Sequence, residues 1–310
     1  MRRSIKAWGA LASDGESASP CFVKEALQNC RDLDDFLCDL SNTMMVWFFQ
    51  RRDVFLSQDT LTKWSRERFD DYILLPATPG FVNRRDCFFV SHFWCRADNP
   101  DPDGEHLRLL QADLQHFEWS YVWVDWTCIP QSPRQKTEEA YFMRSLETMS
   151  GLIRNCGFAC HYPPHEARLW ILYEVAEYTL SASNGFETCE GFVDVSKFVN
   201  HIQEMVEVGV HRTLAKHRYR CTHDRDKAYL ASWLEILVLL KRLRVDIMDV
   251  RRLLDRLTWD LMSKSTYQVI PGGFLHVKKY EGILICNGQT YLFTPFPKRV
   301  SLSATIGLMH

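Results

Sequence analysis

The chain has 310 residues, with 37 Lys and Arg against 39 Asp and Glu, and its formal net charge at pH 7 is −2. Hydrophobic residues make up 46% of it, which is enough apolar side chain for a packed core. A charge this close to zero disfavours a general nucleic-acid-binding role, and the longest apolar run, near residues 236–240, is too short to cross a bilayer.

The 11 cysteines are scattered along the chain, and no apolar segment follows the basic residues 1–6 as a secretory signal requires. We therefore expect reduced thiols in a cytosolic or nuclear protein, and we take the cytoplasm as the expected location. No membrane partner is expected.

Residues 1–80 are predicted to be an N-terminal helical extension. Apolar residues recur at helical spacing between Phe22 and Leu40, a second apolar segment covers residues 44–49, and a third helix is predicted over residues 60–72. We expect these segments to pack on the core, because apolar helix faces usually bury against their own domain. A separate binding module is the alternative.

Residues 87–131 are the stretch around which the chain is organised. The run CFFV from residue 87 is typical of a strand buried on both faces. Leucines at helical spacing follow from Glu105, and a second apolar run covers residues 121–124. A strand, a helix and a strand at this spacing predict a βαβ unit with parallel strands.

The carboxyl ends of these two strands carry the candidate binding residues, because ligands of open parallel sheets bind beyond those ends. The residues after the first strand are Ser91, His92, Trp94 and Arg96, and the residue after the second is Asp125.

The rest of the core is predicted to alternate helix and strand. A helix begins near Thr137, a third strand covers residues 157–162, a further helix covers 166–180, and a fourth strand lies near residues 192–193. Residues 81–195 are therefore expected to form an α/β domain.

The C-terminal part is predicted to be a helical segment over residues 196–265 and a small antiparallel β-hairpin appendage over residues 266–310. Asn287-Gly288 is a strong signal for a tight hairpin turn. Basic residues gather at 211–225 and 241–256; they form either a nucleic-acid face or a solvated helix of mixed charge.

Trp170 and Glu174 lie one turn apart on the helix predicted at 166–180, and therefore on the same face. An aromatic ring beside a carboxylate suits a ligand with a flat ring and hydroxyl groups, and the carboxylate can stabilise an oxocarbenium-like centre as a glycosidic bond breaks. A core Trp beside a solvated Glu is the structural alternative. Glu177 lies one turn beyond Tyr173, so the spacing leaves open which acid faces the sheet.

Three further groups of residues were weighed. Spacings suitable for zinc occur among Cys156, Cys160, His161 and His165, but adjacent strand residues point to opposite faces. Cys95 or Cys128 could act as a nucleophile with His92 as its base, or could be a buried thiol. A pyrophosphate could be bound by Arg96, Arg134 and Arg168, although each is also typical of a surface charge. Neither nucleotide-binding fingerprint, Gly-x-Gly-x-x-Gly or a P-loop, is present.

Three motifs together resemble the TIR-like superfamily over about residues 84–193. They are FVSH at 89–92, YVWVDWTCIPQ at 121–131 and WILYE at 170–174. The middle motif is similar to the heterokaryon-incompatibility (HET) branch, whose second strand runs into an Asp-x-x-Cys-Ile-x-Gln segment. One departure is the loop at 132–134, which lacks the glycine common in TIR loops.

The resemblance implies an α/β fold with a flavodoxin-like parallel sheet, and in enzymatic members it implies cleavage of the nicotinamide–ribose bond of NAD in signalling or defence. It maps the catalytic acid onto Glu174. NAD is then a substrate, with no tightly bound cofactor and no metal. The residues expected to bind it are Ser91, His92, Trp94, Arg96, Asp125 and Trp170.

Two alternatives to the enzyme remain open at this point. Many TIR-like domains are non-catalytic modules that self-associate, so a homo-oligomer is an expected partner. A transferase that uses a nucleotide or an aminoacyl-tRNA on the same sheet is the further alternative.

Overall fold

The computed structural model describes residues 1–11, 21–37, 46–77, 81–162, 166–182, 195–221, 223–259 and 263–298. The chain forms two compact units. The first contains residues 1–166 and 177–197, and the second contains residues 167–176 and 198–310. The fourth strand predicted near residues 192–193 lies outside the described residues.

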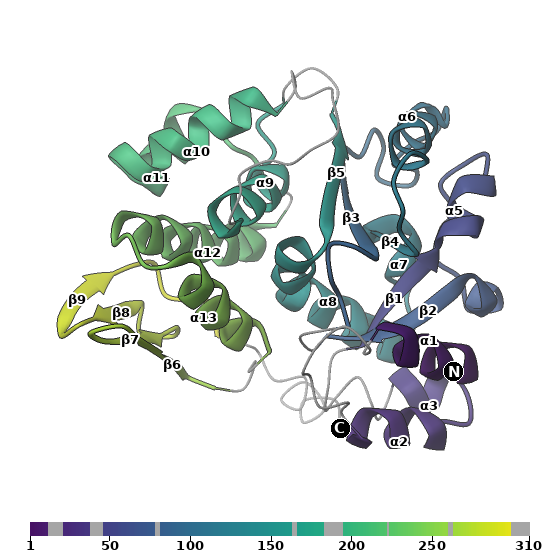
Figure 1. The fold of residues 1–310 in the computed structure, drawn as a ribbon. Coiled ribbons are helices and arrows are strands. Elements are labelled where there is room, and N and C mark those ends of the chain that lie inside the picture. Colours follow the sequence, from purple (N-terminus) through teal and green to yellow (C-terminus); the bar gives the residue numbers. More distant parts are fainter. Residues whose placement is uncertain are drawn as a thin grey trace, which may run out of the picture. The chain divides into compact units, whose positions relative to one another are not determined.

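The first unit is an α/β layer built on a mixed five-stranded sheet of order β2-β1-β4-β3-β5 (Figure 1). Its strands are β1 (Val46–Arg51), β2 (Tyr72–Pro76), β3 (Cys87–His92), β4 (Tyr121–Val124) and β5 (Gly157–His161). Its helices are α1 (Arg2–Leu11), α2 (Cys21–Asn29), α3 (Leu33–Asp35), α5 (Arg52–Ser57), η3 (Arg66–Asp71), α6 (Glu105–Leu114), α7 (Asp125–Cys128) and α8 (Lys136–Asn155). Helix α9 (Leu169–Ser181) begins in the second unit and ends in the first.

Strands β4, β3 and β5 are mutually parallel, as the sequence predicts, and β1 joins β4 and β2 in antiparallel pairs. Helix α6 connects β3 to β4, and α8 lies between β4 and β5 along the chain. One face of the parallel strands packs Val90, Val122 and Val124 against the leucines of α6. On the other face Phe89 stacks on Trp123, with ring centroids 5.0 Å apart.

The N-terminal region corrects two sequence expectations. The apolar segment at 44–49 contributes strand β1, and the helix predicted over 60–72 is an irregular segment followed by the short 3-10 helix η3 and by β2. Every residue of β2 and the first five of β1 are buried. Continuous burial of this kind fits a strand covered on both faces rather than an amphipathic helix.

The second unit is helical and ends in an antiparallel sheet of order β6-β7-β8-β9. Its helices, besides the start of α9, are α10 (Ser196–Val208), α11 (Val210–Lys216), α12 (Asp224–Arg242) and α13 (Ile247–Trp259). The strands are β6 (Ser265–Ile270), β7 (Gly273–Lys278), β8 (Ile283–Cys286) and β9 (Gln289–Leu292). Asn287 and Gly288 have φ of 49° and 82° and form the predicted β8–β9 turn. In the described ranges, no helix combines the length and the hydrophobicity needed to cross a membrane.

Candidate functional site

The carboxyl ends of β3 and β4 bring three of the predicted site residues together. His92 Nε2 lies 2.7 Å from Asp125 Oδ1, and Trp94 Nε1 donates to Asp125 Oδ2 at 2.9 Å. The backbone N–H of Trp126 also donates to this carboxylate, at 2.6 Å. Because β3 and β4 are parallel, with Val90 opposite Val124, the backbone leaves both strands at the same edge of the sheet. Asp125 therefore ties the two strand ends together.

An imidazole, a carboxylate and two indole rings lie side by side at this edge. The His92 side chain is 1% exposed and the Asp125 side chain is 32% exposed. The Trp94 ring lies 6.3 Å from the His92 ring and meets the Trp126 ring edge-on at 5.3 Å. His92 Nδ1 is buried without a hydrogen-bond partner. The arrangement offers an oriented imidazole and a partly exposed aromatic surface for a flat ring.

The other residues predicted for this edge lie elsewhere. Ser91 precedes His92 in β3, so its side chain points to the opposite face, where it accepts a 2.7 Å hydrogen bond from the Tyr162 hydroxyl. Arg96 is exposed in the segment after β3. The sequence prediction placed Ser91 and His92 together at the carboxyl end of β3. It did not take into account that successive side chains of a strand point to opposite faces.

The two acids of helix α9, Glu174 and Glu177, lie in different environments. The sequence spacing did not predict which of them is buried. Glu177 is fully buried, and its carboxylate lies 2.5 Å from the guanidinium of Arg154, which is also fully buried. Glu174 is half-buried, and Trp170 meets Tyr173 edge-on with ring centroids 6.0 Å apart. Glu174 is therefore the more accessible acid of this helix.

Two histidines near the strand ends were not predicted to belong to the site. His161, the last residue of β5, pairs in register with His92, and its Nε2 lies 2.7 Å from Asp113 Oδ2. Burial lowers the pKa of His106 in α6, against the opposing effect of the nearby Asp101 carboxylate. The sequence signal was available, because the parallel strands VSH at 90–92 and ACH at 159–161 both end in His.

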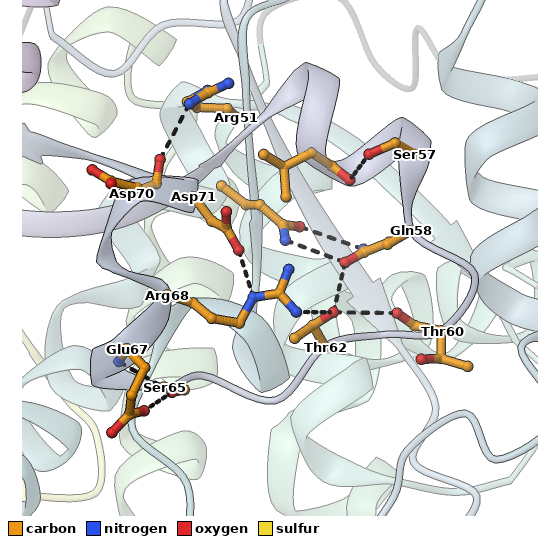
Figure 2. A network of polar contacts seen from close by, with 12 residues as sticks. Arg51, Ser57, Gln58, Thr60, Thr62, Ser65, Glu67, Arg68, Asp70 and Asp71 are labelled. Atoms are coloured by element: carbon orange, nitrogen blue, oxygen red, sulfur yellow. Dashed lines mark hydrogen bonds and ion pairs between the residues drawn. The ribbon is translucent and has the colours of Figure 1, made fainter.

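The irregular segment between α5 and β2 is fixed by a polar network of its own (Figure 2). Gln58 Oε1 accepts hydrogen bonds from Gln50 Nε2 at 3.3 Å and from the Thr62 hydroxyl at 3.1 Å. Arg68 donates to Thr62 at 3.3 Å and pairs with Asp71. Hydrogen bonds between side chains therefore cross-link a stretch that has no helix or strand hydrogen-bond ladder.

This segment in turn holds the loop that follows Asp125. The backbone N–H of Trp64 donates to the Trp126 carbonyl at 3.0 Å, and Trp126 Nε1 donates to the Leu61 carbonyl at 3.2 Å. Gln131 Nε2 donates to the carbonyl of Asp125 at 2.8 Å, which ties the far end of the loop back to its start. The residues mispredicted as a helix thus position the candidate site.

No group of three or more His, Cys, Asp and Glu side chains in the described ranges is arranged to hold a metal ion. Of the residues weighed for zinc, Cys156 is fully buried and His161 is paired with Asp113. His165 lies outside the described residues. The strand predicted over this stretch is confirmed as β5.

The two cysteines considered as nucleophiles differ sharply in environment. Cys128 is fully buried, its thiol donates to the Val122 carbonyl at 3.6 Å, and burial raises its pKa to about 11. Cys95 is exposed. In the folded protein at about pH 8 we expect iodoacetamide to modify Cys95 and to spare Cys128, because the thiolate is the reactive form.

Peptide mass spectrometry before and after urea unfolding measures this difference. Cys128 should become reactive only after unfolding. Rapid modification of Cys128 in the native protein would contradict this expectation and would support a nucleophilic role for Cys128.

Asp125→Ala is expected to lower the free energy of unfolding by about 2–4 kcal/mol, since it leaves the buried His92, the half-buried Trp94 and the backbone N–H of Trp126 without this acceptor. Asp98→Ala, in the exposed segment after β3, is the matched control and should change it by less than about 0.5 kcal/mol. Urea denaturation of both variants checks the difference, and equal stabilities would contradict the role assigned to Asp125.

Comparison of the chain with models of known protein families, with curated proteins and with solved structures finds no match.

Proposed function

We propose that this chain is a TIR/HET-like enzyme with a flavodoxin-like core, and that it cleaves the bond between nicotinamide and ribose in NAD. The strand order supports this proposal. Of the three strands predicted in chain order, the first (β3) is central in the sheet, with the second (β4) on one side and the third (β5) on the other. A flavodoxin-like sheet begins with this strand order. The antiparallel strands β1 and β2 extend the sheet on the β4 side instead of continuing it beyond β5.

The observation that carries the proposal is the meeting of His92, Trp94 and Asp125 at the carboxyl ends of parallel strands. Ligands of open α/β sheets bind at this edge, beside the point where the strand order reverses. Trp94 supplies an aromatic surface for the nicotinamide or adenine ring, and Asp125 holds the His92 imidazole in one orientation.

The motif at residues 170–174 assigns to Glu174 the negative charge that the reaction requires. As the bond between C1′ and the pyridinium nitrogen breaks, its electron pair moves to the nitrogen, and nicotinamide leaves as a neutral molecule. Positive charge develops on the ribose, and the Glu174 carboxylate stabilises it while binding the ribose hydroxyls. Water then adds to C1′ and loses a proton, which gives ADP-ribose; attack by an internal adenine nitrogen gives a cyclic product.

The test is NAD turnover by concentrated purified protein, with released nicotinamide measured by chromatography. Release in proportion to enzyme concentration is the expected result. Absence of release from folded protein would overturn the enzymatic proposal.

A non-catalytic interaction module is the second candidate, and one observation favours it. The Asp125 carboxylate already accepts three hydrogen bonds from its own chain, and His92 is almost fully buried. Polar groups whose hydrogen bonds are made within their own chain can serve only to hold the two strand ends together. Folded protein that self-associates and releases no nicotinamide would support this candidate.

The transferase alternative rested on the basic residues of the C-terminal half, and several of these bind within their own unit. Lys216 pairs with Glu204 at 2.9 Å, and Arg252 pairs with Asp249 at 3.2 Å. Arg256 donates to the backbone carbonyl of Tyr267 at 2.7 Å. These contacts do not favour a nucleic-acid face.

A further inference from the structure

The C-terminal sheet has one covered face and one open face. Alternate residues of its strands, among them Leu275, Val277 and Leu284, are fully buried. Helix α13 packs against β6, where Asp249 accepts a hydrogen bond from Gln268 at 3.2 Å. The residues between these buried positions point to the other side of the sheet.

Large apolar side chains are concentrated on this open face. Val269 of β6 lies opposite Phe274 of β7, and Ile283 of β8 lies opposite Leu292 of β9. The exposed fractions are 77% for Val269, 76% for Leu292, 54% for Tyr267 and 41% for Phe274. Four of the eight exposed large hydrophobic residues found in the described ranges therefore lie on one small sheet. A contiguous apolar surface of this kind marks an interaction site.

The charge on the open face decides which partner fits it. Within the four strands, Lys278 and His276 are the residues at outward positions that can be charged near neutral pH. Glu281 pairs with Lys278 at 3.3 Å, and burial lowers the pKa of His276, which favours its neutral form. A surface without net charge offers nothing to steer an acidic or basic partner. It is complementary to another flat, neutral, apolar surface, and a second copy of this chain provides one.

We propose that two copies of this chain pair through the open faces of their C-terminal sheets. Val269 lies on the edge strand β6 and Leu292 on the opposite edge strand β9. They also lie in different cross-strand rows, because Val269 is level with Phe274 and Leu292 is level with Lys278, four residues further along β7. A two-fold axis that runs diagonally across the face brings the two residues together, with the strands of the two sheets crossing near a right angle at the ~10 Å separation of packed sheets. Val269 of each copy then meets Leu292 of the other, and the same patch serves both subunits.

Sedimentation velocity over a wide range of protein concentration tests the pairing. The wild-type chain should be a dimer that dissociates on dilution. Val269→Asp should weaken the dimer on the order of 100-fold, because it buries an unpaired carboxylate between two apolar faces. Val208→Asp is the matched control: Val208 is 42% exposed on α10, and this variant should dimerise as the wild type does.

Both Asp variants should remain folded, since both valines are exposed, and circular dichroism confirms this. A wild-type chain that stays monomeric at every concentration would overturn the proposal, and so would a dimer equally weakened by the two variants. The contact between Val269 and Leu292 has its own test. Oxidation of an equimolar mixture of Val269→Cys and Leu292→Cys chains should cross-link them, whereas neither variant alone should cross-link above the wild-type level. A mixture that does no better than its components would rule out this contact.

Discussion

Glu174→Gln is expected to reduce nicotinamide release from NAD by about 100- to 1,000-fold, the range found when one group that stabilises transition-state charge is removed. Gln keeps the size of the side chain and its capacity to bind hydroxyl groups, but it cannot balance the positive charge that develops on the ribose. We therefore expect the loss in kcat, with a smaller change in KM, since the charge appears only in the transition state.

Glu207→Gln is the control for this measurement. Glu207 is an exposed acid on α10, and the same chemical change there should leave the rate of release unaltered. Wild-type protein that releases nicotinamide at the same rate as the Glu174→Gln variant would remove Glu174 from the mechanism while leaving the NAD-cleaving activity in place. An inactive wild type contradicts the activity itself, so the two failures can be told apart.

The parallel centre of the fold was predictable because its signals are local. Strands β3 and β4 are continuous apolar runs, and α6 between them shows its buried stripe as leucines at helical spacing. The proximity of His92 to Asp125 followed from the same information, since parallel strands that are neighbours in a sheet end at the same edge. Two of the candidate residues thus lie together at the edge where the sequence places both strand ends.

The N-terminal strands were not predictable by the same means. Residues 61, 64 and 69 show helical spacing, yet Trp64 is buried because it meets Phe48 of β1 edge-on, with ring centroids 5.7 Å apart. Strand β1 is defined by pairing with β2 and β4, which lie about 20 and 70 residues away along the chain. Periodicity within a short window carries no information about such partners.

Side-chain contacts between a helix and a neighbouring strand or helix were equally unpredictable from the sequence. Asp113 of α6 reaches His161 of β5, and Arg154 of α8 reaches Glu177 of α9. Each pair depends on how a helix is rotated against its neighbour, and charged residues at these positions are also typical of a solvated face. The spacing within α9 could not distinguish its catalytic candidate from its buried acid for this reason.

Glu177→Gln is expected to lower the free energy of unfolding by about 3–5 kcal/mol, since it removes the carboxylate that lies 2.5 Å from the fully buried Arg154 guanidinium. Glu139→Gln provides the matched control. Glu139 pairs with Arg134 at 2.9 Å, and its side chain is 48% exposed, so its loss should cost no more than about 1 kcal/mol. Urea denaturation monitored by circular dichroism measures both values.

The double variant Arg154→Met/Glu177→Met should recover much of the loss, because it removes both charges instead of stranding one. Equal effects of Glu177→Gln and Glu139→Gln would contradict the buried pair. The same variants separate the two acids of α9 by function. Glu177→Gln, assayed at a temperature where it stays folded, should retain NAD cleavage, whereas Glu174→Gln, assayed in the same way, should lose it. One helix then carries one acid for the fold and another, less than one turn away, for the reaction.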